Sequence, residues 1–207
     1  MILDAHAHCG RQFREPPQDF QAYLDAAEGT GIEGVVMFPP VMEVYDRGNP
    51  DFEDDDYWRR RREAANKYLL KLGGAGLEVF PFFFVWNDFA VEQLEPDFQG
   101  IKWHRHPDEP KYDYQHPRCA AAIKEIRRRN LPVMLEEELA NTMHFLDELA
   151  PDVRVIIPHC GALNGGYHEL QRLGVWAREN VCTDTSVAPL ESTIIDYVDR
   201  HGHERLL

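Results

Sequence analysis

Short apolar runs alternate with stretches of helical periodicity along most of the chain. The runs have the length of buried strands, and the stretches between them place apolar residues three or four positions apart. This alternation predicts a parallel sheet whose strands are joined by helices. Strands are predicted within 1–10 and at 32–38, 79–86, 100–104, 131–135, 153–157 and 180–186, and helices at 18–29, 57–72, 89–95, 117–129, 140–149, 166–179 and 190–200.

The number of repeated units favours a closed barrel over an open sheet. A chain of 207 residues can bury one substantial core, so we expect a single domain over 1–207. The printed sequence ends at Leu207, where an eighth strand is expected to begin. The predicted fold is therefore α/β, a (β/α)8 TIM-type barrel cut short before strand 8.

The first predicted strand carries a motif with the spacing of a metal site. Asp4, His6 and His8 alternate with apolar residues, and side chains two apart on a strand point the same way. Two imidazoles on one strand face can hold a divalent metal ion. We therefore expect His6 and His8 to be metal ligands, provided that partners come from elsewhere in the chain.

Polar side chains also stand at the carboxyl ends of the later strands. In a parallel barrel these ends meet at one mouth, where such folds place their active sites. The convergence of these residues, more than any one of them, predicts a functional site. They are Asn87, Lys102, His104, Glu136, His159, Asp184 and Ser186.

Other polar residues are expected to be structural or solvated. The basic run 59–62 follows an acidic run and is interpreted as a solvated helix start. The remaining histidines are expected at the surface or as helix caps: His106, His116, His144, His168, His201 and His203.

Five motifs in order, DAHAH, GIKWH, LPV, IIPHCG and NVCTDTS, resemble the amidohydrolase superfamily. The chain is most similar to the amidohydrolase-related branch, or family 2, which includes the aminocarboxymuconate semialdehyde decarboxylase group. The resemblance covers essentially the whole chain. It implies a (β/α)8 barrel with one or two divalent metal ions, commonly zinc. It also implies hydrolysis of C–N, C–O or lactone bonds, or decarboxylation without redox change.

The resemblance assigns roles residue by residue. His6 and His8 match the metal ligands of strand 1, and His159 matches the strand-6 histidine, which is a ligand or an acid–base group. Lys102 matches the lysine of the GIK motif and is expected to be unmodified and to orient a substrate carboxylate or carbonyl. Substrate-binding roles are expected for His104, Asn87 and Ser186.

The chain departs from the family pattern at two places. Glu136 stands where the family often has histidine; as a ligand it would weaken the Lewis acidity of the metal. Alternatively, Glu136, Glu137 and Glu138 form a solvated loop at a helix N-terminus. The family's strand-8 aspartate, its general base, would lie just beyond Leu207. If the chain lacks it, Asp184 is the nearest acid that could take its place.

The leading functional prediction is a metal-dependent hydrolase that acts on a small carboxylated metabolite through metal-activated water. One alternative is a non-oxidative, metal-dependent decarboxylase. The other is a catalytically silent relative of structural or binding function, which the missing strand-8 aspartate would support.

The charge of the chain indicates which classes of partner are disfavoured, and its cysteine content indicates the cellular compartment. The chain has 36 acidic and 22 basic residues and a formal charge of −14, which disfavours nucleic acids and anionic membranes as partners. Four scattered cysteines without CxxC spacing and the absence of a signal peptide favour a reduced, cytoplasmic protein. We expect a small-molecule substrate, and a homodimer is left open.

Overall fold

The structure is a computed structural model that describes residues 2–11, 18–74, 76–106, 109–187 and 190–207. The chain divides into two compact units. Unit 1 comprises Met1–Phe84 and Glu92–Gln99, and unit 2 comprises Val85–Val91 and Gly100–Leu207.

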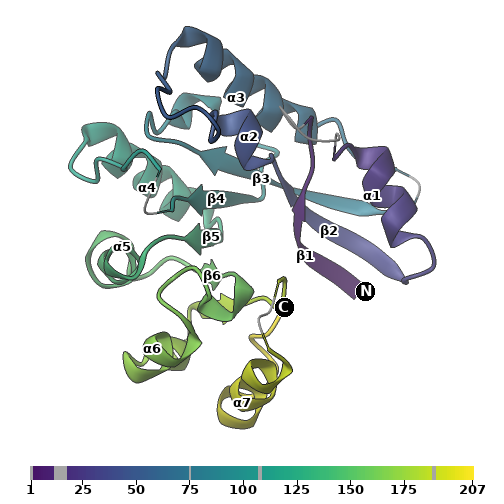
Figure 1. The fold of residues 1–207 in the computed structure, drawn as a ribbon, viewed down its shortest axis with the longest axis vertical. Coiled ribbons are helices and arrows are strands. Elements are labelled where there is room, and N and C mark those ends of the chain that lie inside the picture. The colour runs from purple at the N-terminus through teal and green to yellow at the C-terminus, as the bar shows by residue number, and fades with distance from the viewer. Residues whose placement is uncertain (1, 12–17, 75, 107–108, 188–189) are drawn as a thin grey trace. The chain divides into compact units, whose positions relative to one another are not determined.

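Unit 1 is built from three parallel strands and three helices (Figure 1). The strands lie in the order β1-β2-β3. The elements are β1 (Ile2–His8), α1 (Phe20–Ala27), β2 (Ile32–Phe38), α2 (Val41–Val44), α3 (Asp56–Leu69) and β3 (Glu78–Val85).

Aspartates define where the two longer helices of unit 1 begin. The Asp19 side chain accepts a hydrogen bond from the Ala22 N–H at 2.9 Å and caps α1. Asp55 does the same for α3, accepting from the N–H groups of Tyr57 and Trp58 at 2.9 and 3.1 Å. These caps satisfy amide groups that have no partner within the helix.

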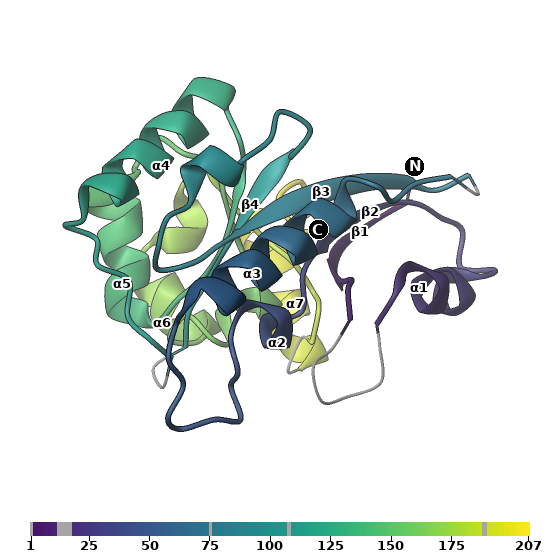
Figure 2. The same cartoon turned by 90° about the horizontal axis from the view of Figure 1, so that it is seen from above.

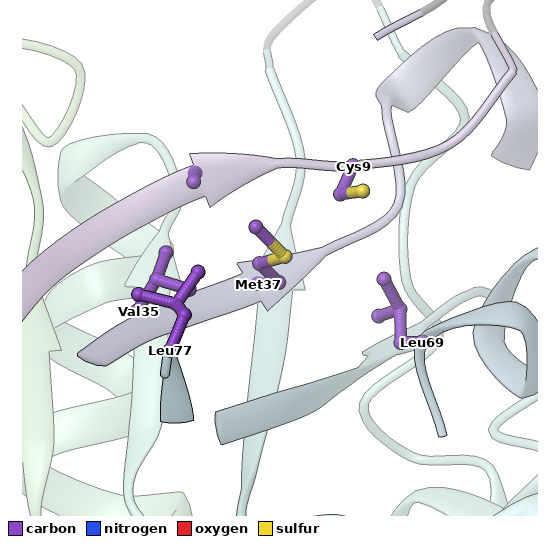
Figure 3. Packing of buried hydrophobic residues seen from close by; sticks show 6 residues of the cluster. Cys9, Val35, Met37, Leu69 and Leu77 are labelled. Carbon is purple, nitrogen blue, oxygen red and sulfur yellow. The ribbon is translucent and has the colours of Figure 1, made fainter. Parts of the chain in front are cut away.

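The core of unit 1 lies between its strands and α3, which packs against β2 (Figure 2). On β1, Ala5 and Ala7 are buried while Asp4, His6 and His8 are half-buried, as the alternation predicted. A cluster of buried apolar side chains joins β1, β2 and α3, as Figure 3 shows. Its members are Ala7, Cys9, Val35, Met37, Leu69 and Leu77.

Unit 2 contains four parallel strands in the order β4-β5-β6-β7, with helices between them (Figure 1). A π-helical turn, Phe145–Leu149, continues α5. The elements are β4 (Gly100–His104), α4 (Pro117–Arg129), β5 (Val133–Glu136), α5 (Leu139–His144), β6 (Val155–Ile157), α6 (Tyr167–Arg172), β7 (Val181–Thr183) and α7 (Glu191–His201).

The last residues of the chain pair with β7. Leu206 forms a parallel bridge with Thr183 of β7. The Thr183 N–H donates to the Arg205 carbonyl at 3.0 Å, and the Leu207 N–H donates to the Thr183 carbonyl at 2.8 Å. The segment where strand 8 was expected to begin therefore lies next to β7 and forms an isolated parallel bridge with it.

The predicted α/β fold of alternating strands and helices is confirmed, with differences in detail. Helix 117–129 has its predicted bounds, with Pro117 at the first turn and the His116 side chain as its cap. Between β2 and α3, where no element was predicted, the structure contains the short helix α2. The helix predicted at 166–179 is interrupted because Gly174 adopts a left-handed conformation.

The basic run 59–62 is not simply a solvated helix start. The Arg62 side chain is buried, and its guanidinium forms hydrogen bonds of 2.7 and 3.1 Å with both carboxylate oxygens of Asp54. It also donates to the Val44 carbonyl at 3.3 Å, so it ties α3 to the end of α2.

All four cysteines are free thiols. In the part of the chain that the structure describes, we find no helix with the length and apolar character needed to span a bilayer.

Candidate functional site

The buried carboxylate of Glu136, at the end of β5, is surrounded by basic side chains. Its Oε2 lies 2.7 Å from the Nζ of Lys102. Its Oε1 lies 2.9 Å from the Nε2 of His104 and 2.6 Å from the Nε2 of His106. The Nε2 of His159 lies 3.6 Å from Oε2. Unit 2 therefore brings side chains from the ends of β4 and β6, and from the loop after β4, onto the carboxylate at the end of β5.

The register of the strands explains this convergence. In the pairing of β4 with β5, Lys102 lies opposite Met134 and His104 lies opposite Glu136. Lys102 and His104 are two residues apart, so they point to the same face of β4, whereas Trp103 points to the other. The prediction that these strand ends converge therefore agrees with the geometry of unit 2.

The surrounding charges keep Glu136 ionised. Burial acts to raise the pKa of its carboxyl, but the positive charges of Lys102 and His104 and the hydrogen bonds from His104 and His106 outweigh it, so the pKa lies well below its usual range. Burial acts to lower the pKa of His104, but Glu136 and Glu109 outweigh it and raise that pKa. The cluster is therefore an anion held by cationic groups in a buried setting.

The imidazole of His159 is oriented by the segment that follows β7. Its Nδ1 lies 2.8 Å from the carbonyl oxygen of Ser186. Because a carbonyl only accepts, Nδ1 carries the proton and donates, and Nε2 holds the lone pair of the neutral ring. The Nε2 atom is the one that faces Glu136.

The backbone around His159 is held in a costly conformation. His159 and Cys160 have φ angles of +59° and +49°, in the left-handed region that residues with a side chain seldom adopt. The Asp184 carboxylate accepts hydrogen bonds from the His159 N–H at 2.8 Å and from the Ser186 N–H at 3.1 Å, and it also accepts from the Ser186 hydroxyl. Strain of this kind is common at functional sites, where the surrounding structure fixes it.

A second buried network supports the cluster. The Nε of Arg105 lies 3.0 Å from a carboxylate oxygen of Glu137, and its Nη2 lies 2.7 Å from Glu138. The Tyr114 hydroxyl donates to Glu137 as well. Since Glu136 and Glu137 are both buried, the alternative interpretation of the three glutamates as a solvated loop is wrong for these two residues.

In unit 1, His6 and His8 lie near each other on β1, with ring centroids 5.7 Å apart. Each packs against the ring of Phe38, edge to face, at 4.8 and 4.7 Å. The Nδ1 of His8 lies 3.2 Å from the Pro39 carbonyl oxygen, so Nδ1 donates and Nε2 holds the lone pair. This is the usual arrangement of a metal-binding histidine.

Asp4 has a structural role in unit 1. It accepts a hydrogen bond from the His6 N–H at 3.0 Å and another from the Tyr23 hydroxyl at 2.9 Å. Its two oxygens therefore fix the backbone before His6 and join β1 to α1.

Three side chains of unit 2, His104, His106 and Glu136, offer ligand atoms that all lie within 4.8 Å of one another. Nitrogen and carboxylate donors of this kind suit zinc and similar ions. The two nitrogens also lie at hydrogen-bond distance from Glu136 Oε1. The Nε2 of His159 lies 3.6 Å from Glu136 Oε2, close to the roughly 3.3 Å between neighbouring ligands of a tetrahedral zinc ion, and that oxygen also lies 2.7 Å from Lys102 Nζ.

Two residues predicted to bind substrate lie in different settings. Ser186 belongs to the His159 network described above. Asn87 follows β3 and is half-buried. Among the described residues, its buried Oδ1 has no hydrogen-bond partner. Such an oxygen can accept a hydrogen bond from a ligand, but no contact joins Asn87 to the Glu136 cluster among the interactions that the structure describes.

Sequence reasoning missed His106. We expected it at the surface, yet its Nε2 forms the shortest contact to Glu136 in this cluster, at 2.6 Å. A signal for it was present, because His104 and His106 repeat the spacing of His6 and His8. The loop around it includes residues 107 and 108, which lie outside the described residues.

No family model matches the chain, and no curated protein matches it. Solved structures do match. A 2,6-dihydroxybenzoate decarboxylase from Rhizobium is 15% identical, with a TM-score of 0.67, and the match covers 100% of this chain and 86% of that one. An amidohydrolase 2 from Bifidobacterium longum subsp. infantis is 18% identical, with a TM-score of 0.65, and the match covers 99% of this chain and 81% of that one.

A third similar structure is assigned as a 2-pyrone-4,6-dicarboxylic acid hydrolase from Pseudomonas putida. It is 15% identical, with a TM-score of 0.62, and the match covers 99% of this chain and 80% of that one. At these identities the likeness shows the fold alone, which this chain shares with the three structures. The resemblance that the motifs indicated is thus confirmed at the level of the fold.

Proposed function

We propose that this chain is a metal-dependent hydrolase that acts on a C–N, C–O or lactone bond of a small carboxylated metabolite. The observation that carries the proposal is the Glu136 carboxyl group, buried at the strand ends of unit 2 with Lys102, His104, His106 and His159 around it. A buried charge of this kind is costly as a purely structural device. Perturbed titratable groups gathered at the strand ends of such a fold are typical of active sites.

The proposed metal ligands are His6, His8, Glu136 and His159, and zinc is the proposed ion. When bound, such an ion polarises a carbonyl group and makes water a better nucleophile at neutral pH. The chain's own residues do the rest. His159 is proposed in one of two roles, because its Nδ1 is engaged by Ser186 and only Nε2 remains: as a ligand of the ion, or, when it is not bound to the ion, as the group whose Nε2 takes up or delivers a proton.

Lys102 is proposed to attract the substrate carboxylate through its ammonium group, whose Nζ is held at Glu136. Asp184 is proposed to hold His159 and Ser186 in place and to be a catalytic carboxylate. His104, Asn87 and Ser186 are proposed to contact the substrate.

Non-oxidative decarboxylation is the second candidate reaction. It is favoured by the structural likeness to the 2,6-dihydroxybenzoate decarboxylase. In that case the carboxylate of the substrate is the leaving group, and an acid such as protonated His159 delivers the proton to carbon.

Metal analysis tests the proposed site. We expect wild type, stripped with a chelator and reloaded with zinc, to hold about one ion per chain after dialysis. The His6→Ala/His8→Ala double variant and Glu136→Gln should each hold much less. Glu148→Gln removes an exposed carboxylate and is the matched control. Equal metal content in wild type and both site variants would overturn the proposal.

Product analysis separates the two reactions. Ring opening of 2-pyrone-4,6-dicarboxylate without release of carbon dioxide would support lactone hydrolysis. Release of carbon dioxide from 2,6-dihydroxybenzoate would support decarboxylation. A metal-loaded protein that turns over neither of these acids, nor any ester, lactone or amide in a panel of carboxylated metabolites, would instead support the catalytically silent relative.

We propose a small molecule as the main partner, and neither nucleic acid nor membrane. The acidic balance of 36 against 22 charged residues supports this view. A cytoplasmic location and a homodimer are further proposals, which fractionation and light scattering would test.

A further inference from the structure

Unit 1 contains a cavity of about 540 Å³ that plays no part in the proposed reaction. It is lined by the segment after β1, by α2 and by one face of α3. The polar side chains that carry the argument are Arg11, Glu43, Arg60, Arg61, Tyr68 and Lys71. Its size falls in the range of pockets that bind small molecules.

Positive charge is concentrated in this cavity. Three arginines and a lysine line it, in a chain whose formal charge is −14. Arg60 and Arg61 come from α3, and Lys71 follows the end of that helix. Guanidinium groups bind carboxylates and phosphates through paired hydrogen bonds, so the wall is suited to an anion.

Glu43 gives the cavity a second feature. Glu43 is only 7% exposed, and among the described residues its Oε1 has no hydrogen-bond partner. Burial raises the pKa of this carboxyl to about 7, although Arg61 and Arg11 act to lower it. A buried oxygen left without a partner costs free energy, and a ligand that donates a hydrogen bond to it recovers part of that cost.

The chain keeps its backbone close to this carboxylate. A Cβ placed on Gly10 would lie 3.0 Å from Glu43 Oε2 and 2.8 Å from Pro40 Cδ. Glycine at position 10 therefore lets the backbone approach Glu43 closely, directly before Arg11 of the cavity.

We propose that this cavity binds a small hydroxylated carboxylic acid. Its carboxylate is held by the arginines of α3, and its hydroxyl group donates to Glu43. The arginines favour a ligand with a carboxylate, and the buried, unpartnered oxygen of Glu43 favours a ligand with a hydrogen-bond donor. Together they select a ligand that has a carboxylate and a hydroxyl group. A simple dicarboxylate offers no donor to Glu43, so it should bind less well. The proposal goes beyond the proposed function, because none of its residues belongs to the proposed metal site.

Isothermal titration calorimetry with L-malate, succinate and inorganic phosphate tests this site on the full chain. We expect wild type to bind L-malate at least tenfold more tightly than succinate, which lacks the hydroxyl group. Glu43→Gln should reduce this preference to a few-fold or less. Equal affinity for malate and succinate in wild type, or binding of phosphate alone, would overturn the proposal.

Variants of α3 separate a specific site from general attraction of anions. Arg61→Gln should weaken L-malate binding at least tenfold. Arg60→Gln is a second variant, at an exposed position where the substitution leaves the core intact. Lys67→Gln removes the same charge from the same helix outside the cavity and should leave the affinity unchanged. A similar loss in all three variants would mean that only net charge matters, and the site would be rejected.

Discussion

The ammonium of Lys102 lies 2.7 Å from the Oε2 of Glu136, and the two side chains are only 0% and 4% exposed. Ions so deeply buried stabilise a protein only through each other and through their hydrogen bonds. The pair therefore fixes the centre of the candidate site, and a change to either partner leaves the other charge buried.

Removing the Glu136 charge should destabilise the protein strongly. We expect Glu136→Gln to lower the free energy of unfolding by about 3 to 5 kcal/mol, because Lys102 then lacks its carboxylate. Urea denaturation at neutral pH measures this change. Glu148→Gln, at a side chain 73% exposed, should leave the midpoint unchanged.

A double variant distinguishes loss of the pair from loss of packing. Lys102→Met combined with Glu136→Gln removes both charges, so we expect it to be clearly more stable than Glu136→Gln alone. A double variant no more stable than Glu136→Gln would show that the buried charge of Lys102 is not the cause.

Glu43 should make stability depend on pH in a direction unusual for a carboxyl. Its pKa is raised from 4.5 to about 7 in the folded protein, so the folded state binds more protons in that interval. Its contribution to stability is therefore present below pH 4.5 and is lost as pH rises through about 7. Relative to Glu43→Gln, wild type should lose about 1 to 2 kcal/mol between these limits, after allowance for solvent screening.

Thermal or urea unfolding of both proteins across this pH range checks the prediction. Parallel stability curves for wild type and Glu43→Gln would show that Glu43 titrates normally. Glu28→Gln, at an exposed carboxyl of unit 1, serves as the control for the loss of one negative charge.

Gly161 should be intolerant of a side chain. Its φ is +79°, and a Cβ there would collide with Leu170 and lie 3.1 Å from the Trp176 ring. Gly174 has a similar φ of +72°, but nothing lies within 4 Å of its Cβ position. Gly174→Ala should therefore cost only the backbone term of about 1 to 2 kcal/mol.

Because of the collision, we expect Gly161→Ala to lower the free energy of unfolding by about 1 to 3 kcal/mol more than Gly174→Ala does. Because Gly161 follows the strained His159–Cys160 backbone, we also expect lower metal content in this variant. Equal destabilisation by the two alanines, measured by urea denaturation, would show that the neighbours of Gly161 yield easily.

We expect the buried Arg62 to contribute to stability and an exposed arginine such as Arg172 to contribute little. Arg62→Met leaves Asp54 and the Val44 carbonyl without their buried donor, and we expect a loss of about 1 to 3 kcal/mol. Arg172→Met removes an exposed arginine paired with Glu169 and should not shift the melting temperature measurably. Identical melting temperatures for the two variants would contradict the structural role of Arg62.

Much of the fold could be read from the sequence because it depends on local patterns. The apolar runs define the strands, and capping residues define helix ends such as that of α4 at Pro117. The alternation in β1 correctly placed His6 and His8 on one face. Strand parity likewise indicated that Lys102 and His104 point the same way.

What the sequence could not give is which charges meet after the strands pair. His104 and Glu136 are 32 residues apart, and only the register of β4 with β5 sets them opposite each other. His106 was assigned to the surface because no local pattern shows that a loop folds back over a buried carboxylate. The same holds for Arg62, whose partner Asp54 lies outside the helix.

By itself, then, the sequence determined the α/β architecture and the strand ends that bear chemistry, because these follow from periodicity and spacing; its ordered motifs added the resemblance to the amidohydrolases. Only the tertiary structure decided that Glu136 is a buried anion held by Lys102 and histidines, and that Glu43 faces a cationic cavity. Burial and pairing between distant residues set the energies of charged groups, and neither is encoded in local sequence.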